Sequence, residues 1–207
     1  MRLRGLTTCC FFTASAASAW WASAAPVGGR DIDEAKARKV RAAYLYNFAK
    51  FVKWPAGAFK DDKAPFVIGV LGDDPFDDTL DDTVKGKTIH GRVIQVRRFH
   101  WEEEKARSEP LRCHLLYIAR SERGRLSQVL AVLKKRPVLV VSDIAGFAHN
   151  GGMIGFVLEK GRIAFEINRE ALEQAHLKAS SKLLKLARIV KSRKRREPKS
   201  QGFAQNQ

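Results

Sequence analysis

The chain has 207 residues, which is enough for one folded domain with additional terminal segments. Apolar residues make up 45% and charged residues 29%, so the composition excludes a globally disordered chain, and 15 Gly and 7 Pro exclude fibrous and low-complexity classes. The formal net charge is +16, which favours an acidic partner: a nucleic acid, an anionic lipid surface or an acidic protein.

The first 25 residues have the pattern of a secretory signal peptide. Arg2 and Arg4 precede an uncharged run from 6 to 25, which ends in the small residues that signal peptidases recognise. A retained membrane anchor is the alternative, but the Ser and Thr content and the marginal length count against it. Removal of 1–25 leaves a net charge of +14 and Cys113 as the sole cysteine, so we expect an exported protein without an internal disulfide.

The remaining chain divides by composition. We expect a short N-terminal lead-in over 26–38, a folded domain over 39–190, and a basic disordered tail over 191–207. The tail contains six Lys or Arg and one acidic residue, and so contributes +5 of the net charge. Such a tail is suited to peripheral contact with an anionic membrane surface.

Hydrophobic patterns predict alternating helices and strands within the folded domain. A helix over 33–54 is predicted to face the core with Val40, Tyr44 and Phe48, and it ends before Pro55. The further predicted elements are strands over 66–71, 93–99, 113–119 and 137–142, helices over 75–84 and 122–134, a hairpin of 153–158 with 163–167, and a helical region capped by Asn168 that runs to about 190 with an interruption near Ser180.

Short apolar strands separated by helices are typical of parallel sheets covered on both faces. The predicted fold class is therefore α/β, with a mixed, mostly parallel sheet of about six strands, flanking helices in a Rossmann-like layer sandwich, and a C-terminal β-hairpin followed by helices.

Two acidic motifs are candidate ligand sites. Gly72-Asp73-Asp74-Pro75 follows a strand, where open α/β sheets bind ligands, but it lacks G-x-G-x-x-G and places carboxylates where a phosphate would lie. A capped helix is the favoured interpretation. Paired aspartates then recur every four residues up to Asp82, and a solvated helix face is favoured over a calcium loop.

No catalytic constellation is predicted, so we expect a protein that is not an enzyme and has no metal and no cofactor. The histidines show no metal-ligand spacing, and H-E-x-x-H and C-x-x-C are absent from the sequence. Cys113 and His114 are neighbours on a predicted strand, so their side chains point to opposite faces and cannot act as a nucleophile and its base.

The loop over 142–152 follows a buried strand and carries three glycines. It is interpreted either as a tight connection that needs glycine conformations or as a recognition loop on a rigid sheet, and both remain open. In the second interpretation Phe147, His149, Gly151 and Gly152 are the candidate partner-binding residues. Nucleic-acid binding is disfavoured, because much of the excess charge lies in the tail and the aromatic residues follow core patterns.

Several segments, taken together and in order, resemble the YfiR-like (YfiR/HmsC) family of periplasmic repressors. They span roughly 39–190 and are AYLYNFAKF (43–51) with Trp54-Pro55, VLGDDPF (70–76), CHLLYI (113–118), Val141-Ser142-Asp143 with Gly146-Phe147 and Gly151-Gly152, FEIN (165–168), and LKASSKLLKLAR (177–188).

The resemblance implies an exported α/β protein that binds the periplasmic sensor domain of an inner-membrane diguanylate cyclase and holds it inactive, which lowers cyclic di-GMP and biofilm formation. It also implies disulfides that this chain cannot form. Family members often pair the cysteine matching Cys113 with one at the position of Gly69, and a second pair in some members falls at Ala148 and Gly155.

Two hypotheses of function follow. The first is a non-enzymatic periplasmic regulator that represses such a membrane sensor. The second is a periplasmic ligand-binding or envelope scaffold module whose basic tail contacts the membrane surface. The sequence leaves both a monomer and a homodimer open.

Overall fold

The computed structural model describes residues 33–101 and 109–193. The predicted signal peptide over 1–25 lies outside the described residues, and so does the predicted tail from residue 194 onward.

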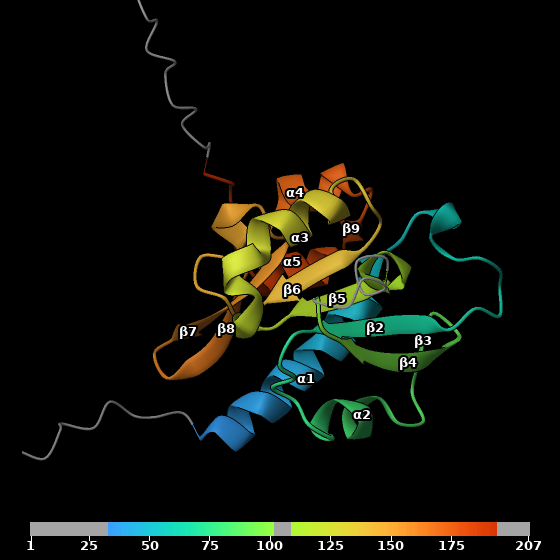
Figure 1. Cartoon of the computed structure of the whole chain (residues 1–207), viewed down its shortest axis with the longest axis horizontal. Coiled ribbons are helices and arrows are strands. Elements are labelled where there is room, and N and C mark those ends of the chain that lie inside the picture. Colours follow the sequence, from blue (N-terminus) through green and yellow to red (C-terminus); the bar gives the residue numbers. More distant parts are fainter. Residues whose placement is uncertain (1–32, 102–108, 194–207) are drawn as a thin grey trace, which may run out of the picture.

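A mixed eight-stranded sheet forms the centre of the described part of the chain (Figure 1). Its strands pair in parallel except β7 with β8 and β3 with β4. Their order across the sheet is β10 (Arg188–Val190), β8 (Arg162–Asn168), β7 (Ile154–Glu159), β6 (Leu139–Ser142), β5 (Leu115–Ile118), β2 (Phe66–Leu71), β4 (Arg92–Phe99) and β3 (Thr88–Ile89). The predicted fold class is confirmed, although the sheet has more strands than expected.

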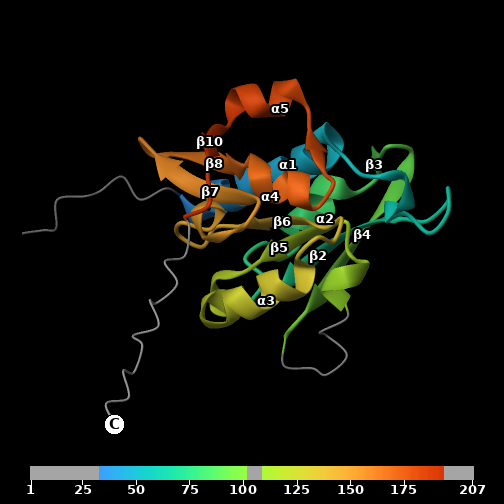
Figure 2. The same ribbon diagram turned by 90° about the horizontal axis from the view of Figure 1, so that it is seen from above.

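Helices cover both faces of this sheet. Helix α1 (Glu34–Phe51) contacts α2 (Thr79–Val84) and α5 (Ser181–Leu186), while α3 (Leu126–Leu133) lies on the opposite side of the sheet from α5 (Figure 2). Helix α4 (Arg169–Gln174) follows β8. A small second sheet pairs β1 (Val52–Lys53) with β9 (Lys178–Ala179) and so joins the end of α1 to the segment before α5. The 3₁₀ turns are η1 (Ala56–Ala58), η3 (Glu109–Arg112), η4 (Arg120–Arg125) and η5 (Ala148–Asn150).

Helix α1 is present as expected, but its buried face differs from the predicted one. Asp33 caps the helix by accepting a hydrogen bond from the Ala35 amide. Phe48 is buried, whereas Val40 is 41% exposed. The buried row instead includes Arg41 and Leu45. The inward placement of Val40 was wrong because an arginine occupies the core side of the helix, and hydrophobicity alone cannot predict that position.

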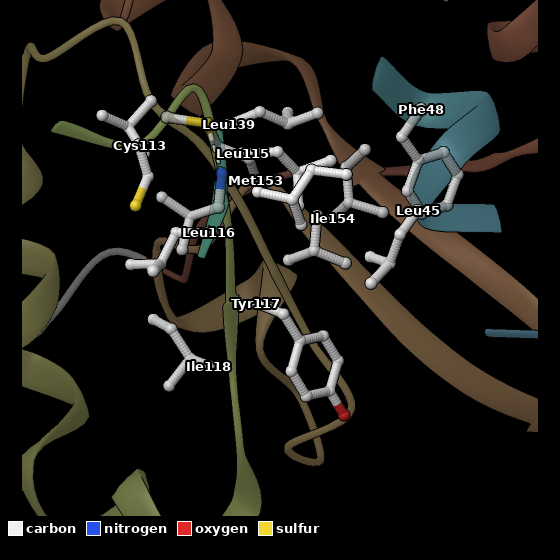
Figure 3. Close-up of a cluster of buried hydrophobic side chains, with 14 of the residues drawn as sticks. Leu45, Phe48, Cys113, Leu115, Leu116, Tyr117, Ile118, Leu139, Met153 and Ile154 are labelled. Atoms are coloured by element: carbon white, nitrogen blue, oxygen red, sulfur yellow. Dashed lines mark hydrogen bonds between the residues drawn. The ribbon is translucent and has the colours of Figure 1, made fainter. Parts of the chain in front are cut away.

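The core lies on both sides of the central strands. Figure 3 shows Tyr117 and Ile154 on the same side as Leu45 of α1, while Leu116 and Ile118 point the other way. All four residues of β5 are buried, as expected for a parallel strand covered on both faces. The alternation of β5 thus divides its side chains between an α1 side and an α3 side.

The hairpin is confirmed in type and position. Lys160 and Gly161 link β7 to β8 with φ values of +48° and +74°. Two positive φ values are the signature of a type I′ turn, whose twist matches that of the flanking strands.

The C-terminal prediction needs correction. The expected helical region over 168–190 divides into α4, β9, α5 and β10, with Ser180 capping α5 through the Leu183 amide. Strand β10 lies at the sheet edge, is three residues long and exposes Arg188 and Ile189, so it lacks an alternating hydrophobic pattern. That absence explains why β10 was not predicted, and the other missing strand of the sheet, β3, is only two residues long. No helix in the described ranges is long and apolar enough to cross a membrane.

Candidate partner-binding loop

The β6–β7 loop (143–153) leaves the carboxyl end of β6 and turns back to start β7 beside it, with Val141 opposite Ile154. Ser142, the last residue of β6, is fully buried. Its hydroxyl donates to the Ile118 carbonyl at 2.7 Å and accepts from the Ile144 amide at 3.0 Å. The loop therefore begins from a fixed position at the edge where parallel sheets place their functional loops.

Phe147 does not belong to the exposed surface of this loop. Its side chain is 1% exposed. A Cβ atom at Gly152 would lie 2.2 Å from Phe147 Cε1, so Gly152 is the residue that leaves room for the ring. The expectation that the loop presents Phe147 to a partner was wrong, because the ring folds inward and fills the loop's own interior.

The exposed residues of the loop are Ala145, Asn150 and Gly151, and His149 beside the last two is partly exposed. The His149 side chain is 30% exposed, and its carbonyl accepts a hydrogen bond from the Arg193 amide at 2.9 Å. Gly151 is exposed and has a φ of +96°, which side chains other than glycine rarely adopt. Partner binding by His149 and Gly151 stays a prediction.

A charged network lies beneath His149. Its Nε2 atom is 3.5 Å from Glu166 Oε2, and this carboxylate is only 4% exposed. The Arg188 guanidinium donates to Glu166 Oε1 at 2.7 and 3.1 Å, and to Glu159 at 2.7 Å. Sequence reasoning missed Glu166 and Arg188, although a glutamate within the apolar strand 163–167 was a signal that its charge needs a partner.

Asn168 joins three segments at the same place. Its Nδ2 atom donates to the Ala148 carbonyl at 2.8 Å and to Ser192 Oγ at 2.7 Å. Its Oδ1 atom accepts from the Ala171 amide and caps α4, as the sequence predicted. The β6–β7 loop, α4 and the chain after β10 are thereby held together.

The other end of the loop carries a second polar cluster. Asp143 Oδ2 lies 3.0 Å from Arg120 Nε and 3.9 Å from Arg41 Nη2, and Arg41 donates to Glu34 at 2.8 Å. Asp143 Oδ1, Arg41 Nε and the Tyr117 hydroxyl are buried without a hydrogen-bond partner among the described residues. Burial, reinforced by the negative charge of Asp143, raises the pKa of Tyr117. Arg41 and Asp143 line a cleft of about 460 Å³.

The Gly72 turn is filled by protein atoms. A Cβ at Gly72 would lie 2.4 Å from Ser121 Oγ, and the same hydroxyl accepts from the Asp73 amide at 3.0 Å. Asp74 accepts from the Phe76 amide at 2.7 Å. These contacts disfavour a nucleotide site, because the residues after β5 occupy the space above the turn. The expected capped helix is not present at this point: α2 begins only at Thr79, and its N-cap residue Asp78 makes no side-chain capping hydrogen bond, so Asp74 caps a turn instead of the helix.

The aspartates around α2 are more than a solvated face. Asp74 and Asp81 both accept from Arg98 of β4, and Asp77 pairs with Arg38 of α1. The hydrogen bond to Asp81 is the main reason why the pKa of Arg98 is raised. Burial acts in the opposite direction, and the hydrogen bond to Asp74 adds to the increase. The acidic residues thus anchor α2 to its neighbours. No group of metal-binding side chains occurs within the described ranges.

Cys113 and His114 point apart, as predicted. The Cys113 sulfur lies against Gly69, and a Cβ atom at Gly69 would be 2.5 Å from it. The His114 ring stacks on Phe59 with centroids 4.3 Å apart, and its Nδ1 accepts from the Val67 amide at 3.0 Å. Burial lowers the pKa of His114, so the neutral ring is the native form.

The model of the YfiR/HmsC-like family matches residues 38–188, which is most of the chain and close to the domain expected over 39–190. The chain therefore belongs to the YfiR/HmsC-like family. This is a family of periplasmic, non-enzymatic regulatory proteins, and membership points to cyclic di-GMP signalling in general. A comparison with curated proteins finds no match for the chain.

The positions of the cysteines implied by the resemblance are close together. Beside the contact between Gly69 and Cys113, a Cβ at Gly155 would lie 3.6 Å from Ala148 Cβ. Bonded cysteines have Cβ atoms about 3.5–4.5 Å apart. The fold thus brings the two positions of each implied pair together, although Cys113 is the only one of the four that is a cysteine in this chain.

Proposed function

We propose that this protein binds the periplasmic sensor domain of an inner-membrane diguanylate cyclase and holds the enzyme inactive, which lowers cyclic di-GMP and biofilm formation. The observation that carries the proposal is the family match over 38–188. In the same proposal residues 1–25 direct export and are removed, 39–190 form the binding domain, and 191–207 are a basic tail.

Repression requires that the protein bind one state of the sensor more tightly than the other, since a ligand shifts an equilibrium only by its difference in affinity. A rigid surface is suited to this task because little ordering is lost on binding. The exposed segment 149–151 has such support: Arg193 holds the His149 carbonyl, and Asn168 holds the Ala148 carbonyl.

The proposal is tested by measuring cyclic di-GMP in host cells with and without this protein, in the presence and absence of the cyclase. Loss of the protein raises cyclic di-GMP if the cyclase is present and leaves it unchanged if the cyclase is deleted. An unchanged level in cells that still contain the cyclase contradicts the proposal.

A scaffold or ligand-binding role is the second candidate, and the +5 charge of 191–207 is the observation that favours it. In that case removal of the tail abolishes membrane association, and cyclic di-GMP does not respond to the protein.

A further inference from the structure

A groove runs between α3, the β6–β7 loop and α4. It comprises two cavities of about 390 and 500 Å³. Both cavities are lined by Ser127, Leu130, Asn150 and Gly151, so they are two halves of one depression. This depression, called the basic groove below, includes Asn150 and Gly151 of the β6–β7 loop.

The charged side chains that line the basic groove are all positive. Arg123 and Arg193 line one half, while Lys134 and Lys135 line the other. Within the described part of the chain, its lining includes no aspartate or glutamate. On neighbouring α4, Glu173 lies 3.7 Å from Arg169, so its charge is balanced locally. The groove therefore attracts anionic groups at both ends.

The floor of the groove is apolar. Leu126, Leu130 and Met153 line it between the two cationic ends. Leu126 and Met153 are mostly buried, whereas Leu130 is partly open to solvent. A ligand that covers this floor gains hydrophobic stabilisation in addition to the ion pairs.

We propose that the basic groove binds an extended acidic segment of a protein partner, with carboxylates at both ends of a short apolar stretch. The inference rests on the proposed function and assigns that segment to the repressed cyclase's periplasmic domain. Surface ion pairs contribute about 0.2–1 kcal/mol each, so the charges alone bind weakly and the apolar centre of the segment is required. The charges also steer association, which weakens as salt increases.

A protein segment fits this groove better than a membrane does. The apolar floor is recessed between two helices and a loop, and a plane of lipid headgroups cannot reach into it. A peptide in an extended conformation enters such a depression and places alternate side chains on its floor.

The test compares two double variants with the same change in charge. Arg123→Glu with Lys134→Glu reverses one cation at each end of the groove. Lys182→Glu with Lys185→Glu reverses two exposed lysines on α5, on the other side of the sheet. The measurement is the affinity of each protein for the purified periplasmic domain of the cyclase, and for phosphatidylglycerol vesicles, at two salt concentrations.

We expect the groove variant to bind the cyclase domain at least tenfold more weakly than wild type, and the α5 variant to remain within twofold. Equal affinities of the two variants would overturn the assignment of the groove. A groove variant that loses only its binding to vesicles would also overturn the assignment. Wild-type protein that binds no cyclase domain would instead overturn the proposed function, and this partner assignment with it.

Discussion

The ring of Phe147 lies so close to Gly152 that a Cβ atom there would be 2.2 Å from its Cε1 atom. The two residues were predicted together as partner contacts, and the structure brings them together for a different reason. Phe147 fills the interior of the β6–β7 loop, and Gly152 provides the space for it. The loop's exposed segment at His149 and Gly151 depends on this pair for its position.

Gly152→Ala is therefore expected to lower the free energy of unfolding by about 1–3 kcal/mol, the usual cost of overpacking. Phe147→Leu in the same chain should relieve part of that loss, so the two changes are not additive. Urea denaturation of both single variants and the double variant measures the coupling. Strictly additive losses would show that the ring and Gly152 do not constrain each other.

Gly69→Cys should form a disulfide with Cys113, because the new Cβ lies against the Cys113 sulfur. In protein lacking residues 1–25 these are the only two cysteines. We expect an increase in stability of about 2–4 kcal/mol under oxidising conditions relative to the reduced variant. Gly69→Ala is the matched control, since it introduces the same crowding but its stability does not change with reductant. Two titratable thiols in oxidised, denatured Gly69→Cys would contradict the expected bond.

Stability should fall in mild acid because of His114. Burial, together with the nearby charge of Arg92, lowers its pKa below the ordinary value of 6.5. As pH falls through 6.5 the unfolded chain binds a proton that the folded protein does not, so the free energy of unfolding decreases until the folded pKa is also passed. In His114→Gln this contribution is absent. The stability difference between wild type and variant should be larger at pH 7.5 than at pH 5, and an equal difference would exclude His114 as the cause.

Arg188→Met should destabilise the protein by about 3 kcal/mol, because it leaves the buried Glu166 carboxylate without its strongest hydrogen bonds. Glu159→Gln is the control. It removes only the exposed partner of Arg188 and should cost less than about 1 kcal/mol. Thermal unfolding distinguishes these results, and similar losses in both variants would show that burial of Glu166 is not what matters.

Local signals were sufficient for the strands of the core and for the hairpin. The continuous apolar run Phe66–Leu71 and the Lys160-Gly161 turn each allow only one structure in this context. The edge strand β10 was missed because its pairing with β8 depends on distant residues and not on its own pattern. Tertiary contacts decided its conformation.

The site was predicted in part for the same reason. The sequence was sufficient to predict the position of the loop 142–152 after a buried strand. It did not predict the direction of the Phe147 ring, because that direction depends on the space left by Gly152. Arg41 and Asp143 are more than one hundred residues apart, and only the fold shows that their charges meet.

The most direct test of the proposed function is copurification from detergent-solubilised host membranes, with residues 26–207 or 26–193 as bait at physiological salt. The shorter bait keeps Ser192 and Arg193, which contact Asn168 and His149, and it lacks the basic residues of 194–207. We expect both baits to recover the same diguanylate cyclase in similar yield. Recovery that requires residues 194–207, or that yields lipid and no cyclase, would contradict repression by the folded domain.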